Sequence, residues 1–397
     1  MLPALLAHSA PSPCHLPPCS PPRTFTQGLA LAGAEQPGNR ADVTEQFKHA
    51  FAEHVSPAGV AVAADCVGSA FTAAPSGAVV LIAGTGSICF WTDAQNRVAR
   101  AGGWGHMLGD EGSAYWIAAS ALRKAMRVMD GMPMDIAPGS PTCTRAEASA
   151  VVDVALTYFG ASIRSQLLQF VHSGFDKAHI AGFTVHLLPL AEARNPIVCG
   201  LFEEAGQWLG ATLRSVVPAI AAAQMSDHPG EGVTEFDVTV AAVGSVWKSW
   251  ALLKAGFMQY ASKPVDLSSP TLGASAAALP ERTGQVRLRT VRLVTLRECS
   301  AMGAAVWGAA TVCDCACCVC VCVRAWVAHD SCAARRGARL CDRRRAHCRL
   351  GVAGLCLTHS LTRLTMAHDL QTGQGHVGLD YSQSTELLDE VVLSGTE

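Results

Sequence analysis

One apolar segment and the glycine turn after it constrain the fold of this chain more than any other feature. Residues 78–83 (Ala-Val-Val-Leu-Ile-Ala) carry no polar side chain, and residues 84–87 (Gly-Thr-Gly-Ser) follow directly. An apolar run of this length is typical of a strand covered on both faces. Glycines allow the backbone to approach a ligand closely. We therefore expect a buried strand that ends at a binding turn.

Strand-like and helix-like segments alternate along the rest of the chain. Such alternation predicts an α/β protein with a ligand cleft between two domains. The predicted strands cover residues 28–32, 60–65, 88–92, 97–101, 236–243 and 291–296, and the predicted helices include residues 43–54, 114–129 and 300–309.

Two helix starts and one strand end carry clear local signals. Thr144 and Glu147 have the spacing of a capping box, and Asn195 before Pro196 fits an N-cap followed by proline at the first helical position. Gly244 follows the strand predicted at 236–243. The run after it predicts a helix whose N-terminus points at a ligand.

The charge balance of the chain excludes several classes of partner. Its 397 residues contain 30 Lys and Arg against 32 Asp and Glu. No overall basic field exists to hold nucleic acid or an anionic membrane, so neither is expected as a partner. Residues 1–6 are apolar but lack the basic start of a secretory signal, so a cytoplasmic protein is expected.

Two segments differ in composition from the rest. Residues 1–27 contain seven prolines and predict disorder. Residues 311–365 are rich in Cys and Arg and are interpreted as an insertion, because ten of the 17 cysteines lie between Cys313 and Cys356. The remaining predicted divisions are a partial N-terminal domain at 28–110, a C-terminal domain at 111–310 and a tail at 366–397.

Three patterns raise alternatives that the sequence does not favour. The cysteines of residues 313–322 include two CxxC pairs, which zinc sites also use. His106 with Asp110 and Glu111 would need further ligands to bind a metal, so no metal site is predicted. Residues 301–323 are apolar enough to mimic a membrane span, but they contain Asp314 and overlap the helix at 300–309.

Several motifs together resemble one family. They are Ala64-Asp65, residues 81–87 (LIAGTGS), 102–117 (GGWGHMLGDEGSAYWI), 180–183 (IAGF), 243–250 (VGSVWKSW) and 296–305 (LRECSAMGAA). This pattern resembles the N-acetylglucosamine kinases of the BadF/BadG/BcrA/BcrD ATPase family over roughly residues 28–310. The resemblance implies a two-domain actin-like ATPase (ribonuclease H-like) fold with an incomplete N-terminal domain, and phosphorylation of the N-acetylglucosamine 6-hydroxyl with ATP and Mg²⁺.

The resemblance also implies roles for individual residues. Asp65 would be the base that takes the hydroxyl proton, as phosphoryl transfer requires. The sugar would meet Asp65, Ser87, Gly103, Trp104, Gly105 and Asp110, and the nucleotide would meet Thr85, Gly86, Ala181, Gly244 and Ser245. Simpler roles stay open: Asp65 as a helix N-cap, Trp104 as a core residue, and Asp110 with Glu111 as caps of the next helix.

The sequence departs from the family pattern in two places. The glycine-rich phosphate hairpin and the sugar-contacting asparagine with which family members open have no counterpart in residues 1–27. Ile88 stands where the vertebrate-like kinases carry an asparagine that touches the sugar. The alternatives are therefore a kinase of a related amino sugar such as N-acetylmuramic acid, the activator ATPase of the same group, and a catalytically inactive sugar-binding relic. Homodimer formation is left open.

Overall fold

The computed structural model of the chain describes residues 25–31, 37–50, 55–74, 76–132, 143–228, 234–267, 284–296 and 385–393. Several segments predicted from the sequence lie outside these residues. They are most of 1–27, the helix at 300–309 and the whole of 311–365.

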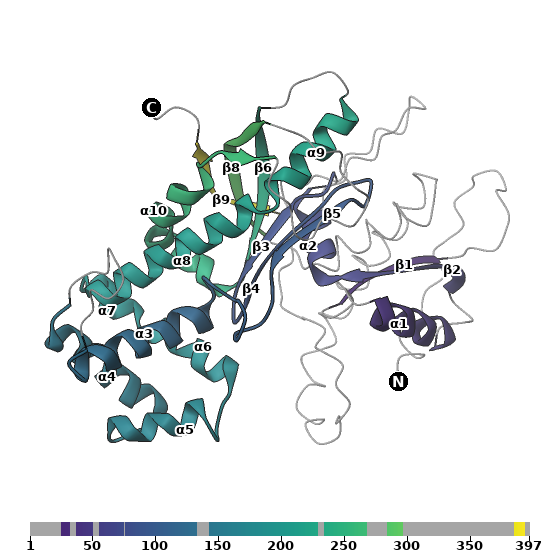
Figure 1. Cartoon of the computed structure of the whole chain (residues 1–397). Coiled ribbons are helices and arrows are strands. Elements are labelled where there is room, and N and C mark those ends of the chain that lie inside the picture. The colour runs from purple at the N-terminus through teal and green to yellow at the C-terminus, as the bar shows by residue number, and fades with distance from the viewer. Residues whose placement is uncertain are drawn as a thin grey trace, which may run out of the picture.

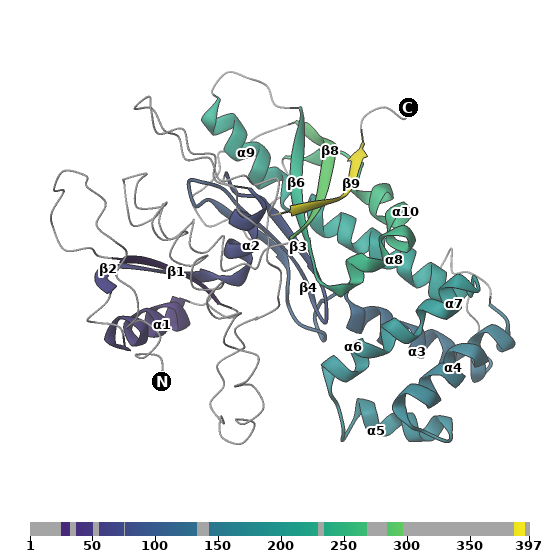
Figure 2. The same ribbon diagram turned by 180° about the vertical axis from the view of Figure 1, so that it is seen from behind.

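A mixed sheet forms the centre of the molecule (Figure 1). Its seven strands are ordered β5-β4-β3-β6-β8-β7, and β9 pairs with β8. β3, β6 and β8 run parallel, so their carboxyl ends share one edge, whereas β4, β5, β7 and β9 pair antiparallel. Figure 2 shows β9 beside β8. The strands are β3 (Val79–Ala83), β4 (Ser87–Thr92), β5 (Val98–Gly102), β6 (Glu235–Val243), β7 (Val265–Asp266), β8 (Gln285–Leu296) and β9 (Thr385–Val392).

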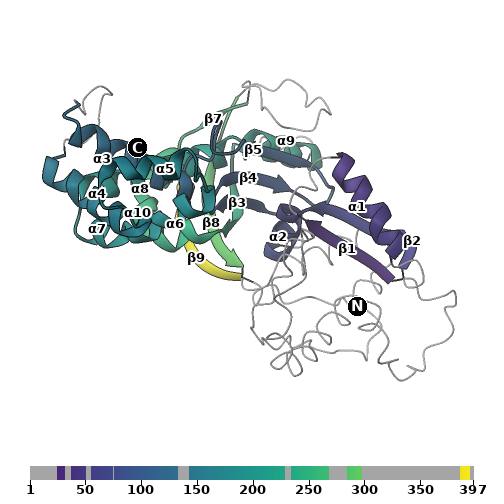
Figure 3. The same ribbon diagram turned by 90° about the horizontal axis from the view of Figure 1, so that it is seen from below.

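Helices cover both faces of this sheet, which confirms the predicted α/β class. One face packs on α2 (Asp65–Ala73), whose apolar side chains meet Val80 and Ala241. Figure 3 shows α2 next to β3. The other face contributes Val79 and Leu81 to the main core. The helices on that side are α3 (Ala114–Met129), α4 (Arg145–Phe159), α5 (Leu168–Val171), α6 (Lys177–His186), α7 (Leu188–Glu192), α8 (Pro196–Arg214), α9 (Val217–Asp227) and α10 (Trp250–Ala261).

A smaller unit precedes the central sheet. β1 (Phe25–Leu31) and β2 (Val55–Ala64) pair in parallel, with α1 (Pro37–Ala50) connecting them. A crossover helix between parallel strands is the βαβ arrangement. β2 leads without a break into α2, so this unit delivers Asp65 to the face of the larger sheet.

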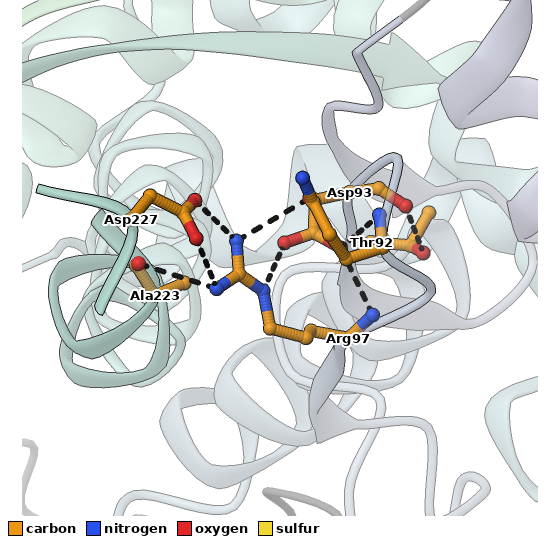
Figure 4. Close-up of polar contacts among 6 residues, drawn as sticks. Thr92, Asp93, Arg97, Ala223 and Asp227 are labelled. Atoms are coloured by element: carbon orange, nitrogen blue, oxygen red, sulfur yellow. Dashed lines mark hydrogen bonds and ion pairs between the residues drawn. The ribbon is translucent and has the colours of Figure 1, made fainter. Parts of the chain in front are cut away.

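Arg97 fastens the turn between β4 and β5 to the last turn of α9 (Figure 4). Its guanidinium donates to Asp93 and, through both terminal nitrogens, to the carboxylate of Asp227. One of these nitrogens also donates to the carbonyl of Ala223 over 3.2 Å. The bidentate pair raises the pKa of Arg97, chiefly through the hydrogen bond to Asp227. The antiparallel edge of the sheet is thus held against the helical layer.

Most local predictions agree with the structure in kind. The helix predicted at 43–54 is α1 at 37–50, and the strand predicted at 60–65 is β2 at 55–64, so their bounds were wrong. Two further predictions also require correction. The helix at 114–129, the Thr144–Glu147 capping box and the Asn195 N-cap are confirmed. The first strand begins at Phe25, within the segment predicted to be disordered, because it pairs with β2. The helix predicted directly after Gly244 is wrong in its start, since a 3₁₀ helix (Ser245–Ser249) comes first.

Strands from both sides of residue 110 share the central sheet. β3, β4 and β5 come from the predicted N-terminal domain, and β6 and β8 from the predicted C-terminal one. This shared sheet does not mark a domain boundary, and the division at 110 stays a prediction.

Candidate functional site

The predicted nucleotide residues gather where β3 and β6 end. These neighbouring strands are parallel, so the turn after β3 (residues 84–86) and Gly244 after β6 lie at the same edge. Carboxyl ends of parallel strands are the usual place for ligand sites in α/β sheets. The side chains of Thr85 and Ser245 are exposed there. The structure thus brings together four of the five residues predicted to meet the nucleotide.

No residue other than glycine fits at position 244 in this arrangement. Its φ is +110° and its ψ 165°, a conformation that other residues rarely adopt. A Cβ at Gly244 would also lie 2.3 Å from the carbonyl oxygen of Ala83. The ends of β3 and β6 therefore approach each other more closely than a side chain would permit.

The 3₁₀ helix after Gly244 changes the predicted role of α10. The indole nitrogen of the buried Trp247 donates to the carbonyl oxygen of Leu81 over 3.0 Å. Trp247 lies within the 3₁₀ helix, and α10 begins only at Trp250. The site is therefore faced by the Gly244 turn and not by the N-terminus of α10.

A second network joins the predicted sugar residues. The backbone N–H of Ser87 donates to one carboxylate oxygen of Asp110 over 3.1 Å, and the Ser87 hydroxyl donates to the carbonyl of Glu111 over 2.7 Å. The ammonium of Lys177, the first residue of α6, donates to the other Asp110 oxygen over 2.7 Å. Asp110 therefore links the β3–β4 turn to the helical layer.

Asp110 is held in an unusual position. Its side chain is only 4% exposed and its φ is +63°, in the left-handed region that aspartate tolerates better than most residues. A Cβ at Gly86 would lie 2.9 Å from its nearer carboxylate oxygen. The predicted phosphate turn and the predicted sugar loop thus share this one buried carboxylate.

The glycine loop, residues 102–112, wraps around the edge of the sheet. Gly103 donates its N–H to the carbonyl of Ser87 over 3.0 Å and accepts from Arg100 over 2.8 Å. Arg100 lies opposite Phe90 on the neighbouring strand, so both side chains share the face that α2 covers. The Trp104 ring stacks on the Arg100 guanidinium, 5.1 Å from centroid to carbon. Trp104 and Asp65 therefore lie on the same face of the sheet.

The exposure of Trp104 decides between its two predicted roles. Its side chain is 68% exposed, so the interpretation as a core residue is wrong. The suggestion that Asp110 and Glu111 cap the next helix is also wrong, because Ser113 is the N-cap of α3 and accepts from the N–H of Trp116.

Asp65 is the first residue of α2, directly after β2, whereas the strand predicted at 60–65 included it as its last residue. One carboxylate oxygen accepts from the N–H of Cys66 over 2.9 Å. The N-cap position belongs to Ala64, whose side chain makes no capping bond, so the capping role predicted for Asp65 is not the one observed. The Cys66 contact is local and does not tie Asp65 to the network of Ser87 and Asp110.

Ala181 lies apart from the other predicted nucleotide residues. It is buried in α6 and belongs to the main hydrophobic core. α6 is fixed to α3 by the Thr184 hydroxyl, which donates to the carbonyl of Ala114 over 2.6 Å. The described contacts of Ala181 are therefore those of a packing residue.

Sequence reasoning missed two residues of the site. Lys177 lies 67 positions from Asp110 in the chain, and no local pattern links them. Arg100 lies in the strand predicted at 97–101, and no role in the site was predicted for it. A signal for Lys177 was its place beside the motif 180–183, just after Asp176, which caps α6.

Neither a metal-binding cluster nor a membrane-spanning helix is found in the part of the chain that the structure describes. No three His, Cys, Asp or Glu side chains among them form a metal-binding group, and the ring of His106 stacks on that of Phe175 at 4.9 Å. In the same residues no single helix is long and apolar enough to cross a membrane. One bent pair, α4 with residues 164–171, meets that test in length and composition only.

Comparison with known proteins places these observations in context. A curated relative, the N-acetylmuramic acid/N-acetylglucosamine kinase of Clostridium acetobutylicum, is 29% identical over 145 residues. That alignment covers 36% of this chain, and the chain spans 43% of the length of the relative.

Two solved structures are also similar. One is a protein of Chromobacterium violaceum provisionally named an N-acetylglucosamine kinase, with 21% identity, a TM-score of 0.44 and coverage of 73% of this chain and 78% of that one. The other, a provisionally named N-acetylglucosamine kinase of Porphyromonas gingivalis, has 16% identity, a TM-score of 0.41 and coverage of 71% and 76%.

A family match covers most of the site described above. The sequence model of the BadF/BadG/BcrA/BcrD ATPase family matches residues 28–255, more than half of the chain. The matched range begins in β1 and ends in α10, so it includes Asp65, the turn after β3, the glycine loop and Gly244. This confirms the resemblance inferred from the motifs. The chain belongs to the BadF/BadG/BcrA/BcrD ATPase family.

Proposed function

We propose that this chain is an ATP-dependent kinase that phosphorylates the 6-hydroxyl of N-acetylglucosamine. The observation that carries the proposal is the joining of two predicted sites at one sheet edge. The turn at 84–86 packs against Asp110, and Asp110 is bonded to Ser87 beside the glycine loop. A kinase needs the phosphate and its acceptor side by side, because phosphoryl transfer is mainly a matter of positioning.

Asp65 is the proposed general base. It lies at the N-terminal end of α2, where the helix dipole favours a negative group. It is half-buried, on the sheet face that also carries Trp104. A carboxylate next to the bound sugar can accept the proton of the attacking hydroxyl.

Trp104 and the glycines beside it are the proposed sugar platform. The ring is exposed but held by Arg100, so it presents a flat apolar surface to solvent. Aromatic rings combine such a surface with low conformational freedom. The two oxygens of Asp110 accept one hydrogen bond each from the protein, and a carboxylate has about four acceptor positions. Asp110 can therefore also accept from a sugar hydroxyl.

ATP use follows from the family, and Mg²⁺ is the metal proposed to accompany it. Mg²⁺ at such sites is held by one or two carboxylates together with the substrate phosphates. Asp65 is assigned to the hydroxyl proton, and Asp110 accepts from Ser87 and Lys177, so neither carboxylate is assigned to the metal. The metal would neutralise charge on the phosphates, and the protein would place the sugar.

N-acetylmuramic acid is the second candidate substrate. The curated relative is named for both sugars. At Gly103 a Cβ would lie 2.6 Å from the Cδ1 of Ile88 and 3.0 Å from a guanidinium nitrogen of Arg100. The Ile88 side chain cannot select between the two sugars by hydrogen bonds.

The test is ADP release by the purified protein with Mg-ATP and each sugar. We expect turnover with N-acetylglucosamine and none with its 6-deoxy analogue. Asp65→Asn should lower kcat by about 10²-fold or more, as loss of a general base does, and should retain sugar binding. Asp153→Asn, at an exposed aspartate of α4, is the matched control and should retain full activity.

Two results would change the proposal. Sugar binding without turnover by the wild-type protein would support the inactive sugar-binding alternative. Normal activity of Asp65→Asn would remove Asp65 from the mechanism.

A further inference from the structure

We propose that Lys177 is a positioning residue that holds Asp110 in place and thereby shapes the sugar site. The inference rests on the proposed function and adds a residue to it. The pairing distance is 2.7 Å, between the Lys177 ammonium and the Asp110 oxygen that does not bind Ser87. The family motif at 180–183 begins three residues after this lysine and does not include it.

The environment of Asp110 makes this pairing important. At 4% exposure, its carboxylate is shielded from water and depends on protein partners. Those partners are one backbone N–H, from Ser87, and one full positive charge, from Lys177. Removing one member of a buried ion pair leaves the other without compensation, which disturbs the site more than loss of an exposed pair. Lys177 is therefore the main counter-charge of Asp110.

The consequence reaches both halves of the site. Asp110 binds the N–H of Ser87 and packs directly on Gly86, so a shift of its carboxylate moves the turn after β3. The carbonyl of Asp110 also accepts from the N–H of Ser113, the N-cap of α3. A carboxylate placed by Lys177 thus sets the position of the turn relative to the glycine loop.

Lys177 itself is well placed for this role. It is the first residue of α6, directly after the N-cap Asp176, whose side chain accepts from two backbone N–H groups of the helix. α6 is fixed to α3 by the bond from Thr184 to Ala114. The lysine therefore extends from a fixed helix end towards the loop.

The test compares Lys177→Met with Lys177→Arg and with a matched lysine elsewhere. Lys124 pairs with Glu204 at 2.9 Å and has a side-chain exposure of 27%, against 29% for Lys177. Lys124→Met therefore removes a similarly exposed lysine from an ion pair at the contact of α3 and α8, in which the carboxylate partner is 39% exposed instead of buried. Each variant is checked for folding by circular dichroism.

The first measurement is amide hydrogen exchange. Lys177→Met should speed exchange of the Ser87 amide at least tenfold, because its acceptor is no longer fixed. Lys177→Arg, which keeps the charge, and Lys124→Met should leave that exchange within threefold of the wild-type rate. Unchanged exchange at Ser87 in a folded Lys177→Met protein would overturn the proposal.

The second measurement is kinetic. Lys177→Met should raise the KM for N-acetylglucosamine about tenfold and change the KM for ATP less than twofold, and Lys177→Arg should restore most of the sugar affinity. An equal effect of Lys124→Met would reduce Lys177 to a general structural role. If the wild-type protein phosphorylates no amino sugar, the proposed function fails, and the exchange of Ser87 alone decides the role of Lys177.

Discussion

Replacing Gly244 by alanine tests the close approach on which the site depends. The structure imposes two penalties on the alanine. The backbone at φ +110° and ψ 165° suits glycine alone, and the added Cβ would lie 2.3 Å from the Ala83 carbonyl oxygen and 2.8 Å from the Gly84 nitrogen. These are backbone atoms at the end of a buried strand, so they cannot rotate away as a side chain could.

The size of the effect is set by these two penalties. Backbone strain in a region reserved for glycine costs about 1–3 kcal/mol. Forcing extra volume into a packed position costs about 1–3 kcal/mol more. The smaller entropy of the unfolded alanine chain offsets about 0.4–1 kcal/mol. We therefore expect Gly244→Ala to lower the free energy of unfolding by about 3 kcal/mol.

Urea unfolding followed by tryptophan fluorescence measures this loss, and the buried Trp247 reports on the region itself. Gly131→Ala is the control. Gly131 also has a positive φ, +75°, but a Cβ there meets nothing within 4 Å, so only strain of about 1–2 kcal/mol is expected. A loss for Gly244→Ala no larger than that for Gly131→Ala would refute the close approach of β3 and β6.

Three further predictions concern stability and reactivity. Asn195→Ala removes a buried N-cap whose side chain accepts from two backbone N–H groups of α8. The free energy of unfolding, measured in urea, should fall by about 1–2 kcal/mol. An unchanged free energy of unfolding would show that this cap does not stabilise α8. The hydrogen bond from Arg97 lowers the pKa of Asp227 below its ordinary value of 3.8. A lowered pKa stabilises the fold above pH 3.8, and this stabilisation is lost as the pH falls through the pKa of the folded state. The free energy of unfolding should therefore fall more steeply with decreasing pH in the wild type than in Arg97→Met. Equal slopes in the two proteins would contradict this prediction. Burial raises the pKa of the Cys89 thiol, so iodoacetamide should label it only after unfolding, and rapid labelling of the folded protein would show the strand to be open.

Local features of the fold could be predicted because their signals lie within a few residues. The helix at 114–129 has the predicted bounds, and the capping box of Thr144 and Glu147 forms both of its reciprocal bonds. The turn after β3 was visible as two glycines after an apolar run. In each case the deciding interactions join residues at most four positions apart, so the sequence contains them directly.

Other features depend on contacts that the sequence does not display. The 3₁₀ helix after Gly244 contains Trp247, whose indole nitrogen donates to the carbonyl oxygen of Leu81, 166 positions away in the chain. Strand β1 begins at Phe25 because β2 provides a partner, although the residues before it are rich in proline. Tertiary pairing overrides local composition at both points. The same holds for Lys177, whose partner is chosen by the packing of α6.

The exposure of Trp104 shows why the candidate site could be located from the sequence but not described. An apolar ring in a loop normally collapses onto the nearest core, because burial of its surface is favourable. Here the loop is fixed on both sides of the ring, at Gly103 by Ser87 and at Asp110 by Ser87 and Lys177. With both ends fixed, the Trp104 ring lies over the guanidinium of Arg100 and keeps most of its surface in solvent. The ring is exposed because of the anchors around it, so loosening Asp110 should allow Trp104 to move as well.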